Sequence, residues 1–197
     1  MRRERGHSLV EMVVVLALAG LLAGAAVPSL SGLRERAAIR GAARGLVALM
    51  RTLRSRAIAE GRSLALVFER DGRGWRYRLH ADGDGDGVRT SDIADGTDPA
   101  LGPYVRIGDQ WSGVDLGFLP LSRVRKLPSS TGWLASLDDP VQLGATDVLS
   151  FSPKGDATSG SLFLADAGSQ MAAIVLFGPT VRVRVYRYDV TDEEWVS

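Results

Sequence analysis

Hydrophobic side chains follow one another almost without interruption over residues 9–30. A helix of that length rises about 33 Å, which matches the roughly 30 Å hydrocarbon core of a bilayer. Arg2, Arg3 and Arg5 precede this run, and such an excess of positive charge keeps an N-terminus in the cytoplasm. The pattern therefore predicts a membrane-spanning helix over residues 7–30, followed by an extracytoplasmic head.

The helical pattern continues beyond the apolar run, but it becomes amphipathic over residues 31–61. Apolar residues recur there every three or four positions, at Leu33, Ala37, Leu46, Leu49, Leu53 and Ala57. Gly61 is the expected end of the helix. Pro28 has no backbone N–H, so we expect a bend where the helix leaves the membrane.

From about residue 62 onward the period changes from helical to the twofold alternation of strands. Residues 63–70 and 75–81 read as a hairpin joined by a turn at 71–74, and four more strands are expected at 148–153, 161–166, 171–177 and 180–188. The predicted fold class is α+β, with a long helix packed on an antiparallel β-rich head (31–197, its β-rich part 62–197). Residues 108–145 show no clear pattern. There we interpret Trp111 and Trp133 as core residues, with a partner surface as the alternative.

Glu11 lies inside the apolar run, where an ionised carboxylate at mid-bilayer costs about 2.5–3.5 kcal/mol. An ordinary cleaved signal peptide is one alternative, because the run also contains the small-residue stretch LAGAA. The run is longer than a usual signal peptide core, and its acid needs a partner. Both features favour a segment that is retained.

Gly6 followed by HSLVEMVVVLALAGLLAGAAVPSL resembles the class III signal of type IV pilins and pseudopilins. The resemblance implies that a prepilin peptidase removes a leader, residues 1–6, and that His7 becomes an N-methylated terminus. Glu11 is then the fifth residue of the mature chain, and Pro28 takes the place of the family's helix-bending proline. His7 departs from the phenylalanine that is usual there. A carboxylate from one subunit could neutralise the new amine of its neighbour as the helices assemble into a filament.

The head carries a second, narrower resemblance. A phenylalanine–x–proline–x–glycine segment, here Phe151, Pro153 and Gly155, is typical of the GspH/FimT group of minor pseudopilins and minor pilins. The resemblance covers both ends of the chain well and residues 82–145 poorly. It implies a minor pseudopilin of a type II secretion pseudopilus, in the inner membrane with a periplasmic head and other pseudopilins as partners. The alternative is a FimT-like minor type IV pilin that serves pilus biogenesis or DNA uptake.

The composition of this 197-residue chain excludes several classes of functional site. It has no cysteine, which excludes disulfides and thiolate metal sites, and its net charge of +1 argues against a general polyanion binder. His7 and His80 are the only histidines, and there is no zinc-protease helix, nucleophile elbow or phosphate-binding loop. We therefore expect no enzymatic activity.

Two groups of arginines could contact nucleic acid. The amphipathic helix contains seven, Arg34, Arg36, Arg40, Arg44, Arg51, Arg54 and Arg56, against two acids. Arg182 and Arg184 alternate with valines near the C-terminus, in the region that some FimT-like pilins use to grip DNA. A solvated helix face with neighbour-subunit contacts and a half-buried strand are the simpler interpretations. Nucleic-acid binding is therefore not our primary expectation.

The segment 82–98 is strongly acidic. Asp82, Asp84 and Asp86 followed by Gly87 match positions 1, 3, 5 and 6 of a calcium-binding loop, and Val88 would offer a backbone carbonyl. Position 12 is Ile93, so Asp92 would have to substitute for the usual glutamate. Calcium in a structural role and a solvated Asp-Gly turn both remain open. His80 next to this loop is interpreted as a surface or hydrogen-bonded residue rather than a ligand.

Overall fold

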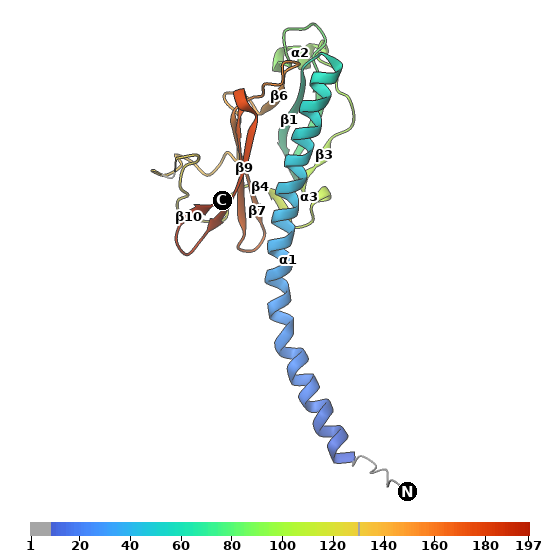
Figure 1. Cartoon of the computed structure of the whole chain (residues 1–197), viewed down its shortest axis with the longest axis vertical. Helices are drawn as coiled ribbons and strands as arrows, with labels where there is room; N and C mark the ends of the chain where they lie inside the picture. Colours follow the sequence, from blue (N-terminus) through green and yellow to red (C-terminus); the bar gives the residue numbers. More distant parts are fainter. Residues whose placement is uncertain (1–8, 130) are drawn as a thin grey trace.

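One long helix and two antiparallel sheets make up the protein. The structure is a computed structural model that describes residues 9–129 and 131–197, with only the backbone for residues 22–36. Helix α1 (Leu9–Glu60) comprises 52 residues. Its C-terminal half packs along the head, while its N-terminal half extends away from it with a gradual curve (Figure 1). The helix continues through Pro28.

Helix α1 ends where the sequence predicts. Gly61 follows Glu60 with a φ of 66°, a left-handed conformation that glycine adopts without strain. The buried face of the helix consists of Ile39, Ala42, Ala43, Leu46, Val47, Met50, Leu53 and Ala57. The prediction for Ala37 is wrong, since this residue is exposed. It lies about 200° around the helix from Ile39, on the opposite side.

The first sheet has four strands in the order β3-β2-β1-β6, and every pairing in it is antiparallel. The strands are β1 (Leu64–Asp71), β2 (Gly74–Ala81), β3 (Val105–Arg106) and β6 (Val148–Phe151). Strands β1 and β2 form the predicted hairpin, in register from Leu64 opposite Ala81 to Asp71 opposite Gly74. A short helix α2 (Thr90–Asp95) follows β2, and α3 (Ile107–Gln110) follows β3.

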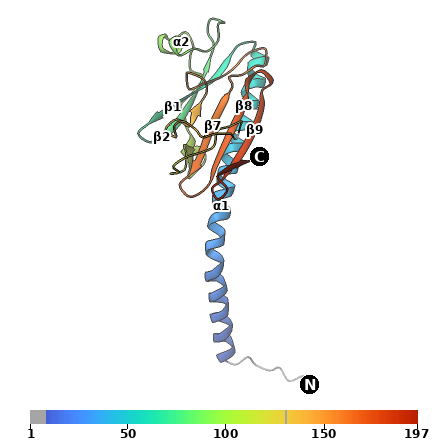
Figure 2. The same ribbon diagram turned by 90° about the vertical axis from the view of Figure 1, so that its left-hand side faces the viewer.

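The second sheet has the order β10-β9-β8-β7-β4, with β5 also pairing with β7. Its strands are β4 (Val114–Leu116), β5 (Val141–Gln142), β7 (Gly160–Asp166), β8 (Met171–Phe177), β9 (Arg182–Asp189) and β10 (Glu194–Val196). A 3-10 turn η1 (Gly178–Thr180) separates β8 from β9. Figure 2 shows β7, β8 and β9 side by side with the upper part of α1 behind them. The predicted antiparallel, β-rich head is confirmed.

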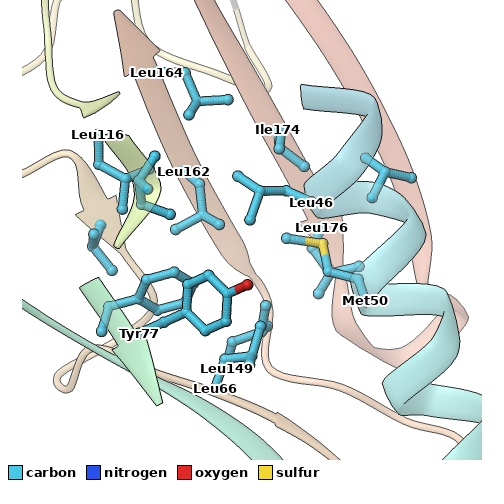
Figure 3. Packing of buried hydrophobic residues seen from close by; sticks show 14 of the residues in the cluster. Leu46, Met50, Leu66, Tyr77, Leu116, Leu149, Leu162, Leu164, Ile174 and Leu176 are labelled. Carbon is cyan, nitrogen blue, oxygen red and sulfur yellow. The ribbon is translucent and has the colours of Figure 1, made fainter. Parts of the chain in front are cut away.

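The main core lies where α1 meets both sheets. Leu46 and Met50 of α1 pack with Leu66 of β1, Leu149 of β6 and Leu162 of β7, together with the residues drawn in Figure 3. All five are almost completely buried. The apolar stripe of α1 and the inward faces of the strands therefore form a single core, in which each element covers the others.

The segment without a clear sequence pattern covers the far face of the second sheet. Leu119 and Val124 pack there against Met171 and Tyr188. Trp111 is half-buried against the main core, as expected for a core residue. Trp133 is also half-buried, and the guanidinium carbons of Arg123 and Arg125 lie over its ring, at 4.1 and 4.5 Å from its centroid.

Candidate functional site

The free half of α1 exposes apolar side chains. Leu9, Leu16 and Leu21 are among those that have more than two thirds of their surface exposed. Glu11 lies in the first turn of the helix, where the helix dipole favours a negative charge. None of the described cations forms an ion pair with it. Within the described residues, the stem thus combines a large uncovered apolar surface with an unpaired carboxylate.

The predicted processing site cannot be compared with the structure, because Gly6 and His7 lie outside the described residues. The backbone of Pro28 belongs to α1, but its side chain is among those not described. The predicted membrane segment 7–30 also lies partly outside the described side chains. Within the described part of the chain, none of the helices is both long enough and apolar enough for a membrane crossing.

In the acidic loop, three of the predicted calcium ligands lie together. Oxygen atoms of Asp82, Asp84 and Asp86 all fall within 4.8 Å of one another. Calcium binds oxygen at about 2.3–2.6 Å, so three oxygens at this spacing can touch one ion. The group does not include Asp92, and the side chain of Val88 is buried with Ala65 and Val148 against the outer face of the first sheet.

Asp82 also organises the loop by itself. The backbone N–H groups of Gly85 and Gly87 donate to its two carboxylate oxygens, over 2.7 and 3.0 Å. Burial alone would raise the pKa of Asp82, but these hydrogen bonds to the charged form outweigh it and hold the pKa below its ordinary value. Asp82 is therefore the fixed, ionised member of the cluster.

Asp84 and Asp86 are exposed, and the electrostatics around Asp86 are unfavourable to its charge. Partial desolvation raises the pKa of Asp86; Arg89 opposes this, and the carboxylates of Asp84 and Asp92 add to it. In addition, Oδ2 of Asp92 is buried without a hydrogen-bond partner among the described residues. Among the described residues only Arg89 forms an ion pair with an acid of this cluster, so the negative charge of the loop is not fully compensated.

Sequence reasoning missed the residue that closes the loop. Asp98 is 1% exposed, and its two oxygens accept hydrogen bonds from the backbone N–H groups of Gly83 and Arg89. It therefore ties the two ends of the loop together. His80 is also buried, and its Nδ1–H donates to the carbonyl oxygen of Asp98 over 3.0 Å. This confirms His80 as a hydrogen-bonded residue.

The arginines of both groups are exposed where the structure describes their side chains. Arg54 donates to the carbonyl oxygen of Gly155 and Arg56 pairs with Glu60, whereas Arg40, Arg44 and Arg51 have no described acidic partner. Arg182 and Arg184 alternate with half-exposed valines in β9, as predicted. They lie on one face of that strand.

Comparisons with known proteins assign the chain to a family. Residues 1–27 match the model of the prokaryotic N-terminal methylation motif, and residues 42–180 match the model of the type II transport protein GspH. The chain belongs to the GspH family. Family membership confirms the predicted resemblance and the predicted role in type II secretion. The matched range covers the C-terminal part of α1 and the head as far as η1, and β9 and β10 lie beyond it.

More distant comparisons add little. No curated protein sequence matches this GspH-family chain. The crystal structure of the minor pseudopilin EpsH from the type II secretion system of Vibrio cholerae is similar over 75% of this chain and 92% of that chain. The two share 13% sequence identity with a TM-score of 0.43, and we base no inference on that similarity.

Proposed function

We propose that this GspH-family protein is a single-pass inner-membrane pseudopilin, processed after Gly6, whose stem joins a periplasmic pseudopilus. The observation that carries the proposal is the free half of α1. About 30 residues, a length of about 45 Å, separate Leu9 from Ile39, the first residue of α1 that is buried among those whose side chains the structure describes. Apolar side chains on this stem need to be covered, first by lipid and then by the stems of neighbouring subunits.

Glu11 has a specific role in this proposal. Cleavage after Gly6 would create a positively charged amine close to Glu11, and a neighbouring stem would bring a second such pair into reach. Because a lone carboxylate in an apolar filament core is expensive, the amine of one subunit and the Glu11 of the next would stabilise each other. The role of the protein is mechanical, without catalysis, and the prepilin peptidase would be its first partner.

Processing is tested on the membrane-extracted protein. Intact-mass and N-terminal sequence analysis should show a chain that begins with a methylated His7 and retains residues 9–30. A chain that begins downstream of Ala26 would exclude the proposal. Gly6→Leu should block processing, whereas Gly41→Ala, a change remote from the cleavage site, should not. Retention of the unprocessed chain in the Gly6→Leu variant thus shows that cleavage depends on that glycine.

A minor type IV pilin remains the alternative role. The GspH model supports secretion, because its description refers to type II transport. Deleting the gene and measuring exported enzyme activity and surface pili in the same strain separates the two. Lost export with normal piliation supports secretion, and lost piliation or DNA uptake with normal export supports the alternative.

We also propose that the acidic loop binds calcium in a structural role. The support is the spacing of Asp82, Asp84 and Asp86, together with the unpaired buried oxygen of Asp92. A divalent cation would supply the charge that Arg89 alone does not. Calorimetric titration of the full-length protein in detergent tests this, and no heat at about millimolar calcium would exclude it.

A further inference from the structure

Strand β9 leaves part of its edge open. On one side, β8 pairs with it from Arg182 to Arg187. On the other side, β10 pairs only with Arg187–Asp189. Over residues 182–186 the described part of the chain therefore supplies no strand to this outer edge. An open edge presents backbone N–H and C=O groups in the pattern that a further strand would pair with.

The side chains at this edge are basic on one face and apolar on the other. Arg182 and Arg184 lie opposite Phe177 and Val175 in the register, and both arginines are exposed. Neither has a carboxylate partner among the described residues, and Arg184 donates only to the hydroxyl oxygen of Tyr186, at 3.5 Å. On the other face Val185 is 39% exposed, next to the partly buried Val183.

We infer that the edge of β9 at residues 182–186 accepts an extended acidic segment of a neighbouring filament subunit by strand addition. Backbone hydrogen bonds would supply affinity, and the two arginines would select acidic side chains at alternate positions. This inference rests on the proposed function, because it takes the neighbour from the filament.

The charges of Arg182 and Arg184 limit which strand can pair with the open edge of β9. A second copy of β9 would place arginines opposite arginines, and like charges directly across a strand pair are destabilising. The location favours a filament neighbour over an exported protein. Strand β8 packs against α1, and Val183 contacts the core that α1 shares with the sheets. The open edge thus belongs to the sheet that packs on the C-terminal half of α1 (Figure 2), and the free half of the same helix would run among the neighbouring stems.

Peptide probes test the strand addition with the full-length protein in detergent micelles. The first probe is a fluorescent peptide in which glutamate alternates with valine. The second has lysine in place of glutamate, and the third keeps the glutamates but has proline in place of a central valine, which cannot complete a strand ladder. We expect the first peptide to bind, the second not to bind, and the third to bind at least about tenfold more weakly.

Charge-reversed variants test the location. Arg182→Glu/Arg184→Glu should weaken binding of the acidic peptide about tenfold or more. Arg40→Glu/Arg44→Glu is the matched control, because it makes the same change in net charge on exposed residues of α1, and it should leave binding unchanged. Circular dichroism shows whether both variants fold. Equal loss in both variants, or equal binding of the proline peptide, would overturn strand addition in favour of unspecific charge attraction.

The occupant is identified by cross-linking in cells. The chain has no cysteine, so Val185→Cys creates a single reactive site at the edge, with Arg73→Cys on the β1–β2 turn as the control. We expect a cross-link to another pseudopilin only from position 185. An exported protein or single-stranded DNA at that site, or filaments that contain the protein without a cross-link, would overturn the inference. Retained peptide binding without any incorporation into filaments would count against the proposed function alone.

Discussion

The indole ring of Trp111 packs directly on Gly45 of α1. A Cβ atom at position 45 would lie 2.5 Å from Cζ2 of Trp111. This contact holds the segment after α3 against the helix, and it explains why a glycine lies within an otherwise helix-favouring stretch. Trp111 is thus a core residue that fits only because residue 45 has no side chain.

Gly45→Ala should therefore destabilise the head by about 1–3 kcal/mol, because overpacking the rigid ring outweighs the better helix propensity of alanine. Gly41→Ala is the control, since nothing lies within 4 Å of a Cβ atom there, and it should stabilise the helix by up to about 1 kcal/mol. Thermal unfolding of the full-length protein measures both. A Gly45→Ala variant as stable as Gly41→Ala would contradict the packing.

Glu11→Leu should leave membrane insertion intact and impair assembly. Breaking a buried ion pair costs about 3–5 kcal/mol, so the assembled fraction should fall more than about tenfold. Glu60→Leu removes a carboxylate at the other end of α1, where Glu60 pairs with Arg56 and Arg62, and it should assemble normally. Membrane fractionation and filament cross-linking give the two measurements. Normal assembly of Glu11→Leu would exclude the amine pairing.

Asp84→Asn/Asp86→Asn should abolish any rise in melting temperature that calcium produces. Without calcium the double variant should be no less stable than the wild type, because ionisation of Asp86 is already disfavoured by desolvation and by its acidic neighbours. Asp192→Asn/Glu194→Gln makes the same charge change on exposed residues elsewhere and should keep the calcium response. Thermal shift assays with and without about millimolar calcium compare them. A calcium response that survives in the loop variant would exclude this site.

Asp71 should make the head sensitive to acid. Its carboxylate accepts a hydrogen bond from Nη1 of Arg106 over 2.6 Å and lies 3.3 Å from Nη1 of Arg76, so it links the ends of three strands of the first sheet. The hydrogen bonds from Arg106 hold the pKa of Asp71 well below its usual range. A depressed pKa contributes stability above the unfolded value of about 4, and this contribution is lost as the pH falls below it.

Asp71→Asn should therefore lower the melting temperature at pH 7 and reduce its decrease between about pH 5 and pH 3. Asp192→Asn changes an exposed acid that has no part in the contacts of Asp71 with Arg76 and Arg106. Its melting temperature should therefore depend on pH as in the wild type. Thermal unfolding across this pH range provides the comparison. An unchanged pH profile in Asp71→Asn would show that the arginine contacts do not contribute to stability.

The periodicity of apolar residues was sufficient to predict the bounds of elements that are buried along their whole length. The hairpin β1–β2 and the strands β7 and β8 lie within a residue or so of their predicted bounds, because their apolar side chains alternate or run together. The two-residue strands β3 and β5 are too short to show a period. The segment that contains Leu119 and Val124 is buried without regular structure, so only tertiary contacts define it.

The acidic loop shows a second limit of prediction from the sequence. The spacing of Asp82, Asp84 and Asp86 was enough to predict that their carboxylates converge. It did not reveal that Asp98 joins Gly83 to Arg89, because a hydrogen bond between residues 15 positions apart leaves no periodic trace. For the stem, the motif around Gly6 and Glu11 was sufficient to indicate the family, since its features have to coincide in register along the chain.

The continuity of α1 from Leu9 to Glu60 has a mechanical consequence. No loop interrupts α1 between its N-terminal end and the head, and Leu46 and Met50 fix the helix in the core, so in the proposed filament both sheets would be coupled directly to the stem. A displacement of the N-terminal end of α1 during filament growth would therefore move the head with it, rather than being absorbed by a linker.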